Sequence, residues 1–185
     1  MRRRAAAVLA ATLLAGPAAA GPCGTDGAWR AAGRIAAFAP VLDAGLRARE
    51  SLLSLSAVAL ASQLRAEAET ARRWGLSETP AFVRENLGDR VPAPVLDAVR
   101  WRAGPGGSVL LRLLFGPGDA IAVTLGETVV FRDTGEAADP ALWAHELEHV
   151  AQYRRLGAMG FARAYVRCPG VMEAEARAAA RRATE

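Results

Sequence analysis

The only two histidines of this 185-residue sequence stand four positions apart, in the stretch "WAHELEHVAQY" (143–153). On an α-helix, residues at i and i+4 lie about 40° apart around the axis, so His145 and His149 would point toward one place. Glu146 lies about 100° further around, beside that place. Two imidazoles with an adjacent carboxylate supply two zinc ligands and a general base. The spacing therefore predicts a zinc site, whereas the alternative of two ordinary helix histidines requires a coincidence of spacing.

A hydrolytic zinc site needs a third protein ligand and leaves the fourth position to water. The sequence has no further histidine, so the third ligand must be a carboxylate or a cysteine. The C-terminal stretch "VMEAEARAAARR" offers Glu173 and, as the alternate, Glu175, which lie about 200° apart on a helix. We expect Glu173 to face the metal. Cys168 is a further possibility, but it competes with a disulfide.

The elements that must position these residues can be read from hydrophobic periodicity and turn signals. Asp139 and Pro140 suit the N-cap and first turn of the histidine helix. A long packing helix is predicted between about Trp29 and Trp74. The runs "SVLLRLLF", "DAIAVTL" and "ETVVFRD", separated by glycine-rich turns, predict a small antiparallel sheet within residues 96–132. The expected fold class is α+β: N-terminal helices, the small sheet, the histidine helix and a C-terminal glutamate helix.

The first twenty residues have the layout of a secretory signal peptide: a basic start, a short apolar run and small residues before the end. That run is too short for a permanent membrane helix. We therefore divide the chain into a signal peptide (1–20), a helical N-terminal part (21–79) and a domain with the predicted zinc site (80–185) that packs with it as one compact unit. An exported protein, periplasmic or extracellular, is expected; a lipid anchor at Cys23 is the alternative, although Pro22 suits it poorly.

Charge gives no indication of a nucleic-acid partner. Removing the three arginines of the signal peptide from the 23 basic residues leaves 20, against 19 acidic residues. The mature chain is nearly neutral, and no arginine-rich run is interleaved with aromatic residues. No permanent membrane span is expected in the mature chain, and the sequence does not indicate an oligomeric state.

The chain has two cysteines, Cys23 and Cys168. Export would place them in a compartment where thiols pair, so we expect a disulfide between the mature N-terminus and the start of the last helix. Two unpaired buried thiols are the alternative.

Three stretches together carry a family resemblance: "AVTLGETVVFRD", "ALWAHELEHVAQYRRLG" and "EAEARAA". Between about residues 80 and 180 the chain resembles the extracellular contractile injection system (eCIS) core domain family, whose members resemble HExxH zinc metallopeptidases of the gluzincin type. The combined HExxHxxQ pattern, from His145 to Gln152, is more specific than HExxH alone. The resemblance implies a zinc-peptidase-like fold with two histidines and a downstream glutamate as ligands. Gluzincins commonly carry an aspartate four residues after that glutamate; Arg177 holds this place here.

Two classes of function follow from these residues. The first is an exported zinc peptidase that cleaves a peptide or protein substrate, with Glu146 as general base. Its oxyanion would need a donor, for which Tyr153, Tyr165 and Arg167 are candidates, and the strand "ETVVFRD" could hold an extended peptide along an open edge. The second is a zinc-containing binding or structural module without turnover, which an injection system could use.

Overall fold

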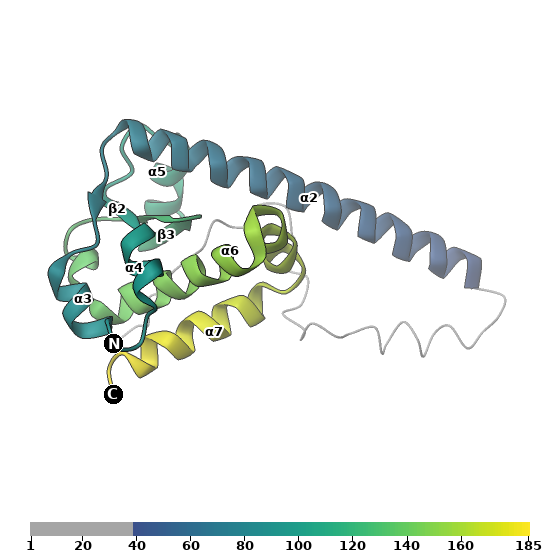
Figure 1. Ribbon diagram of the computed structural model, residues 1–185. Helices are drawn as coiled ribbons and strands as arrows, with labels where there is room; N and C mark the ends of the chain where they lie inside the picture. Colours follow the sequence, from purple (N-terminus) through teal and green to yellow (C-terminus); the bar gives the residue numbers. More distant parts are fainter. Residues whose placement is uncertain (1–38) are drawn as a thin grey trace.

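The computed structural model describes residues 39–185. In chain order the elements are α2 (Ala39–Arg73), β1 (Ser77–Glu78), α3 (Ala81–Leu87), α4 (Ala93–Ala98), β2 (Arg100–Ala103), α5 (Val109–Phe115), β3 (Ala122–Leu125), β4 (Thr128–Phe131), the 3₁₀ turn η3 (Glu136–Ala138), α6 (Pro140–Arg167) and α7 (Pro169–Arg182). Helices flank a small sheet (Figure 1), which confirms the expected α+β class. The predicted signal peptide and the predicted helix N-terminal to residue 39 lie outside the described residues.

The sheet is mixed, so the prediction of an antiparallel sheet was wrong in part. Its strand order is β1-β2-β4-β3. The pairs β1–β2 and β3–β4 are antiparallel, but β2 and β4 are parallel. A parallel pair needs a crossover, which α5 and β3 provide between β2 and β4. The predicted open edge "ETVVFRD" is also corrected, because β4 lies inside the sheet and β3 forms that edge.

The run "SVLLRLLF" is a helix rather than the predicted strand. Ser108 caps its N-terminus, since its side-chain oxygen accepts a hydrogen bond from Leu111 N at 2.9 Å. Leu111, Leu114 and Phe115 are buried, at the i, i+3, i+4 spacing of one helix face, whereas Val109 is exposed. A short apolar run fits a strand and a helix turn equally well, and the serine cap decides between them.

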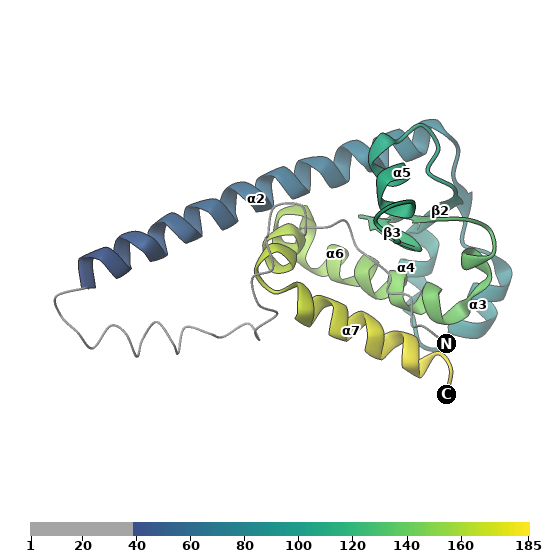
Figure 2. The same cartoon turned by 180° about the vertical axis from the view of Figure 1, so that it is seen from behind.

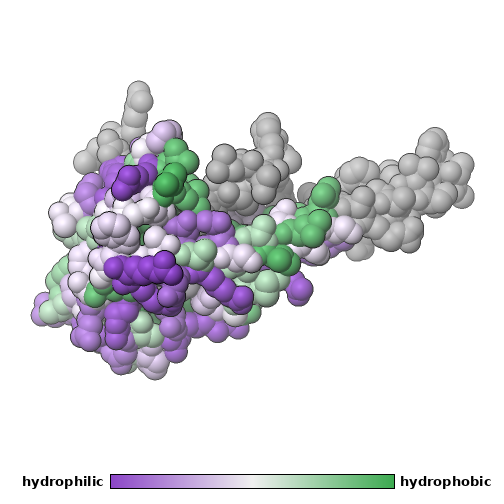
Figure 3. All heavy atoms as spheres, turned by 90° about the horizontal axis from the view of Figure 1, so that it is seen from above, coloured by the Kyte–Doolittle hydropathy of each residue, from purple (hydrophilic) through white to green (hydrophobic). Residues whose placement is uncertain are grey.

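The long helix α2 packs on the body through small and aliphatic residues. Ala57, Leu60, Ala61 and Leu64 are buried. Leu52, Leu55 and Val58, nearer the N-terminal end of α2, are exposed, and apolar side chains gather on this part of the surface in Figure 3. None of the described helices is long and apolar enough to cross a membrane.

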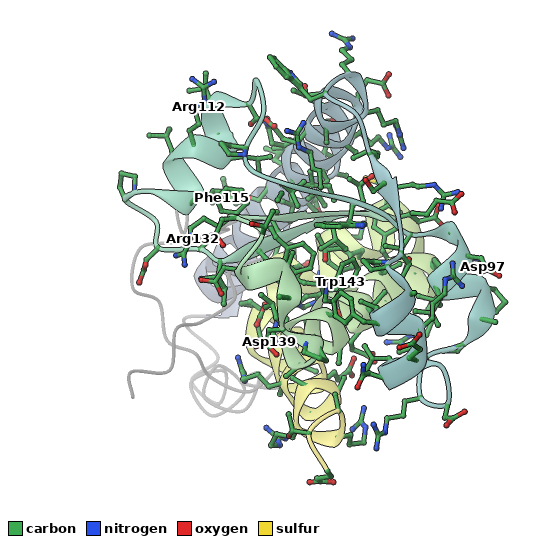
Figure 4. All side chains as sticks on the ribbon, turned by 90° about the vertical axis from the view of Figure 1, so that its left-hand side faces the viewer. Asp97, Arg112, Phe115, Arg132, Asp139 and Trp143 are labelled. Atoms are coloured by element: carbon green, nitrogen blue, oxygen red, sulfur yellow. The ribbon has the colours of Figure 1, made fainter. Side chains whose placement is uncertain are left out.

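Helix α6 carries the two histidines and is bent within its length. It starts as predicted: the Asp139 side chain accepts a hydrogen bond from Ala141 N at 2.8 Å, and Pro140 occupies the first turn (Figure 4). Gly157 has φ 69° and ψ 168°, a conformation that side chains with a Cβ rarely adopt. The chain therefore changes direction at Gly157, and α7 then runs back alongside the first part of α6 (Figures 1 and 2).

Helix α6 contributes to two clusters of buried side chains, one before Gly157 and one after it. The first part packs with α3, α4 and the sheet, where Trp143 lies 4.8 Å from Phe131 and 5.6 Å from Trp101, measured between ring centroids. The part after Gly157 contributes Phe161 and Tyr165 to a second cluster with α2, α5 and Met172 of α7. The turn of α6 with the histidines is thus held between two packed cores.

Cys168 stands between α6 and α7 and is disulfide-bonded. We predict that its partner is Cys23, the only other cysteine of the sequence. Cys23 lies outside the described residues. Non-reducing peptide mapping of exported protein, after thiols have been blocked, should recover a peptide that joins the two cysteines. The Cys168→Ser variant should lose stability by at most about 5 kcal/mol, the entropic limit for so long a loop. Two alkylated thiols in the exported protein would contradict the bond.

Candidate metal centre

The first part of α6 buries four polar residues on one face. His145 is 5% exposed, and Glu146, His149 and Gln152 are fully buried. The helix spacing places the two imidazoles together, with ring centroids 4.9 Å apart. Buried polar side chains destabilise a fold unless they find partners. The partners of these four residues therefore define the site.

Helix α7 brings Glu173 to both histidines. Its Oε2 lies 3.5 Å from His145 Nε2, and its Oε1 lies 3.4 Å from His149 Nε2. Ligand atoms of these three residues all lie within 4.8 Å of one another. Two ligands about 2.1 Å from a tetrahedral zinc ion would be about 3.4 Å apart. The separations between Glu173 and the histidines fit that geometry, and the cluster could hold a metal ion.

The buried atoms without partners point to the same conclusion. Among the described residues, His145 Nε2, His149 Nε2 and Glu146 Oε1 are buried and have no hydrogen-bond partner. Leaving such an atom unpaired costs about 1–3 kcal/mol, so several of them side by side indicate a missing ligand. Two imidazole nitrogens and one carboxylate are a donor set typical of hydrolytic zinc. The residues present therefore fit zinc.

The carboxylate of Glu146 is oriented by the sheet. Thr124 of β3 donates its hydroxyl hydrogen to Glu146 Oε2, at 2.6 Å, and the same hydroxyl lies 3.3 Å from the backbone oxygen of Glu146. One carboxylate oxygen is thus fixed, and the other is left free beside the ligand cluster. Sequence analysis missed Thr124, although a polar residue in the alternating run "DAIAVTL" was a signal.

Gln152 links His149 to the last helix. His149 Nδ1 lies 2.8 Å from Gln152 Oε1, and Gln152 Nε2 donates to the backbone oxygen of Met172 and to Glu175 Oε2, at 3.1 and 2.8 Å. A hydrogen bond to the second ring nitrogen fixes the orientation of a metal-binding histidine. The glutamine of the HExxHxxQ pattern was visible in the sequence, but its partners come from a segment about 20 residues away.

The three candidate oxyanion donors lie in different places. The Tyr165 hydroxyl donates to Glu173 Oε1 at 3.0 Å, and its ring centroid lies 6.4 Å from that of His149. Tyr153 packs against Gly126 of the β3–β4 turn and against Phe161. Arg167 forms an ion pair with Glu50 of α2. Of the three, only Tyr165 contacts a residue of the ligand cluster.

Two further residues of α7 border the site. Glu175, the alternate ligand, accepts the hydrogen bond from Gln152 and lies 3.5 Å from Arg155 Nη2, outside the ligand cluster. Arg177, which stands where gluzincins carry an aspartate, has its Nη1 3.5 Å from Glu173 Oε2. Gln152 of α6 makes the histidine-orienting contact that position 177 does not make.

In the metal-free protein, the electrostatics of the cluster favour a protonated His149 beside an ionised Glu173. Burial alone would lower the pKa of His149, but its contacts with the carboxylates of Glu173 and Glu146 outweigh burial and raise it. Burial alone would raise the pKa of Glu173, but both histidines outweigh it and lower that pKa. The pKa of Tyr165 is raised by burial and by the charge of Glu173. Tyr165 therefore stays protonated and can donate its hydrogen.

The comparisons with known proteins match part of the chain to one family. Residues 78–157 match the family model described as the eCIS core domain. The match begins at β1 and ends at the bend of α6, and it confirms the sequence resemblance over this segment. It includes Thr124 and the HExxHxxQ stretch, but not Glu173. A search of curated proteins found no match, and neither did a search of solved structures.

We predict that the purified protein binds about one zinc ion through His145, His149 and Glu173. Elemental analysis after dialysis should find it in the wild type, and the His149→Ala variant should lose it. Glu148→Ala, a change on the same helix but outside the cluster, is the matched control and should keep its zinc. A full equivalent of zinc in the His145→Ala/His149→Ala double variant would place the metal elsewhere.

We also predict a characteristic pH dependence for the metal-free protein. The raised pKa of His149 stabilises the fold below about pH 6.5, and this contribution is lost as the pH rises through the folded-state value. The lowered pKa of Glu173 stabilises the fold above about pH 4.5, and this contribution is lost only in stronger acid. The melting temperature of chelator-treated protein should therefore fall as the pH rises above about 6.5. The same slope in the His149→Gln variant would contradict this origin.

Proposed function

We propose that this protein, whose residues 78–157 match the eCIS core domain, is an exported zinc-dependent peptidase. One observation carries the proposal. A buried glutamate with one free oxygen stands directly beside two histidines and a second glutamate whose spacing fits zinc. A metal site that served only to hold the fold together would not need the additional carboxylate.

The chain's own residues would divide the chemistry between them. Zinc bound in such a site polarises a carbonyl group and makes water nucleophilic near neutral pH. Glu146 accepts the proton of the attacking water through its free oxygen, because Thr124 occupies the other oxygen. It then passes the proton to the leaving amine. Tyr165 donates a hydrogen bond at the cluster and suits the developing oxyanion once it turns from Glu173.

The sheet edge next to the site suits an extended peptide. β3 is hydrogen-bonded to β4 on one side only and forms the edge of the sheet. Its residue Thr124 contacts Glu146 directly. All four residues of β3 are buried, so a peptide would pair with this edge and run past the general base only where the elements that cover the strand move aside. A hollow of about 390 Å³ borders the end of this strand, lined by Leu125, Tyr153 and residues of α2, and could take a side chain of the peptide.

The second candidate is a zinc-containing binding or structural module without turnover. The observation that favours it is burial: Glu146 and His149 are fully buried, and the side chain of Glu173 is 14% exposed. Turnover needs a substrate carbonyl at the metal, so a peptidase would have to open. The match to the eCIS core domain supports a protein partner from a contractile injection system in either case.

Glu146→Gln separates the two candidates. This variant keeps the size of the side chain and the hydrogen bond with Thr124, but it cannot accept a proton. Zinc content and folding should survive, while cleavage of an unbiased peptide library, read by mass spectrometry, should fall about 10²- to 10⁴-fold.

The matched control is Glu148→Gln on the same helix, which should cleave as the wild type does. Zinc must be measured on each preparation that is assayed. Equal cleavage by wild type and by zinc-loaded Glu146→Gln would refute the general base. A zinc-loaded wild type that cleaves nothing in the library would favour the non-catalytic module.

A further inference from the structure

We infer that Gln152 is a positioning residue that sets the tautomer of His149 and ties this ligand to the helix that carries Glu173. The inference rests on the proposed zinc site. It concerns the metal-free protein as well, because every contact that carries it is made by the chain itself.

The amide of Gln152 can be oriented in only one way. Its Nε2 lies 3.1 Å from the backbone oxygen of Met172 and 2.8 Å from Glu175 Oε2. Both atoms are acceptors, so the donating nitrogen must face them and the amide oxygen must face His149. Both N–H donors and one acceptor position of this fully buried amide are used.

The orientation of the amide then decides the state of the imidazole. Gln152 Oε1 can only accept, so His149 Nδ1, at 2.8 Å, must carry the hydrogen. A neutral His149 therefore has its lone pair on Nε2, the buried atom without a partner that faces Glu173. A metal needs that lone pair. Without Gln152, both tautomers would be open to the ring, and one of them cannot bind through Nε2.

The same side chain links two ligands in space. Met172, whose backbone oxygen accepts from Gln152, directly precedes Glu173. Glu175, the second acceptor, lies one residue beyond Glu173. One amide on α6 therefore holds the backbone and a side chain of α7 on either side of the ligand carboxylate. This link would keep Glu173 within reach of His149 when no metal holds them together.

Position-specific variants test this role. Gln152→Leu removes the acceptor and the donor at similar size. Gln152→Glu keeps the acceptor for His149 but places two carboxylates together at α7. The double variant Gln152→Glu/Glu175→Gln restores the donor–acceptor pair in reverse, because the new amide at position 175 can donate to the new carboxylate at position 152. Arg163→Gln, an exposed change on the same helix, is the control.

Two measurements are made on each variant. The first is the histidine tautomer in metal-free protein well above neutral pH, from ¹⁵N chemical shifts; the chain has only two histidines, and His145→Gln assigns the remaining signals. The second is zinc affinity, from competition with a chelator. Wild type and control should show hydrogen on Nδ1 of His149. Gln152→Leu should shift the ring toward hydrogen on Nε2 and weaken zinc about 10- to 100-fold.

Gln152→Glu should keep the wild-type tautomer but bind zinc more weakly, and the double variant should regain most of the loss. A folded Gln152→Leu variant with unchanged tautomer and zinc affinity would overturn the inference. If that variant does not fold, a double variant that binds zinc no more tightly than Gln152→Glu would overturn it instead. A wild type that binds no zinc would defeat the proposed function, while the tautomer would still decide what Gln152 does to His149.

Discussion

The structure depends on satisfying one buried polar face of one helix. His145, Glu146, His149 and Gln152 are at most 5% exposed, and their polar atoms cannot all bond within α6. Partners must come from elsewhere, because an unpaired buried polar atom costs about 1–3 kcal/mol. Thr124 arrives from β3, and Glu173, Met172 and Glu175 arrive from α7. The atoms that remain without partners are those that a metal ion and its substrate would use.

This requirement explains the course of the chain after the histidines. A straight continuation of α6 would carry the following residues away from His149. Gly157, with its positive φ, turns the helix so that Phe161 and Tyr165 pack beside His149 and α7 returns with Glu173. Cys168 and Pro169 stand at the second change of direction, where Pro169 takes the first turn of α7. The site thus requires two breaks in the otherwise helical segment from Pro140 to Arg182.

The sequence predicted what depends on neighbouring residues and missed what depends on distant ones. The cap at Asp139 and the pairing of β3 with β4 follow from local signals and were predicted. The parallel pairing of β2 with β4 brings together segments far apart in the chain, which no local pattern encodes. The run at 108–115 was misassigned because short apolar runs fit both periods, and the cap at Ser108 was overlooked.

The site shows the same division. The i, i+4 spacing on α6 identified both histidines, because a single helix turn fixes their geometry. The contacts of Gln152 with α7 needed the return of the chain to be known. Arg177 stands where gluzincins carry an aspartate, yet an amide on the histidine helix makes an orienting contact with His149. The absence of one motif residue is therefore weak evidence against a metal site as long as the position of the facing helix is unknown.

The surroundings of Glu146 are the physical argument for the proposed catalytic centre over a structural metal site. A carboxylate buried without a full set of partners lowers stability, and a fold that used zinc only as a cross-link would gain by replacing it. Instead, Thr124 holds one of its oxygens, and the other is left free beside the three ligands. Unsatisfied polar atoms retained together inside a packed interior are typical of functional sites. In the proposed peptidase the site would have to open for a substrate and close on it, and the exclusion of water would then strengthen each electrostatic interaction of the general base and the metal with that substrate.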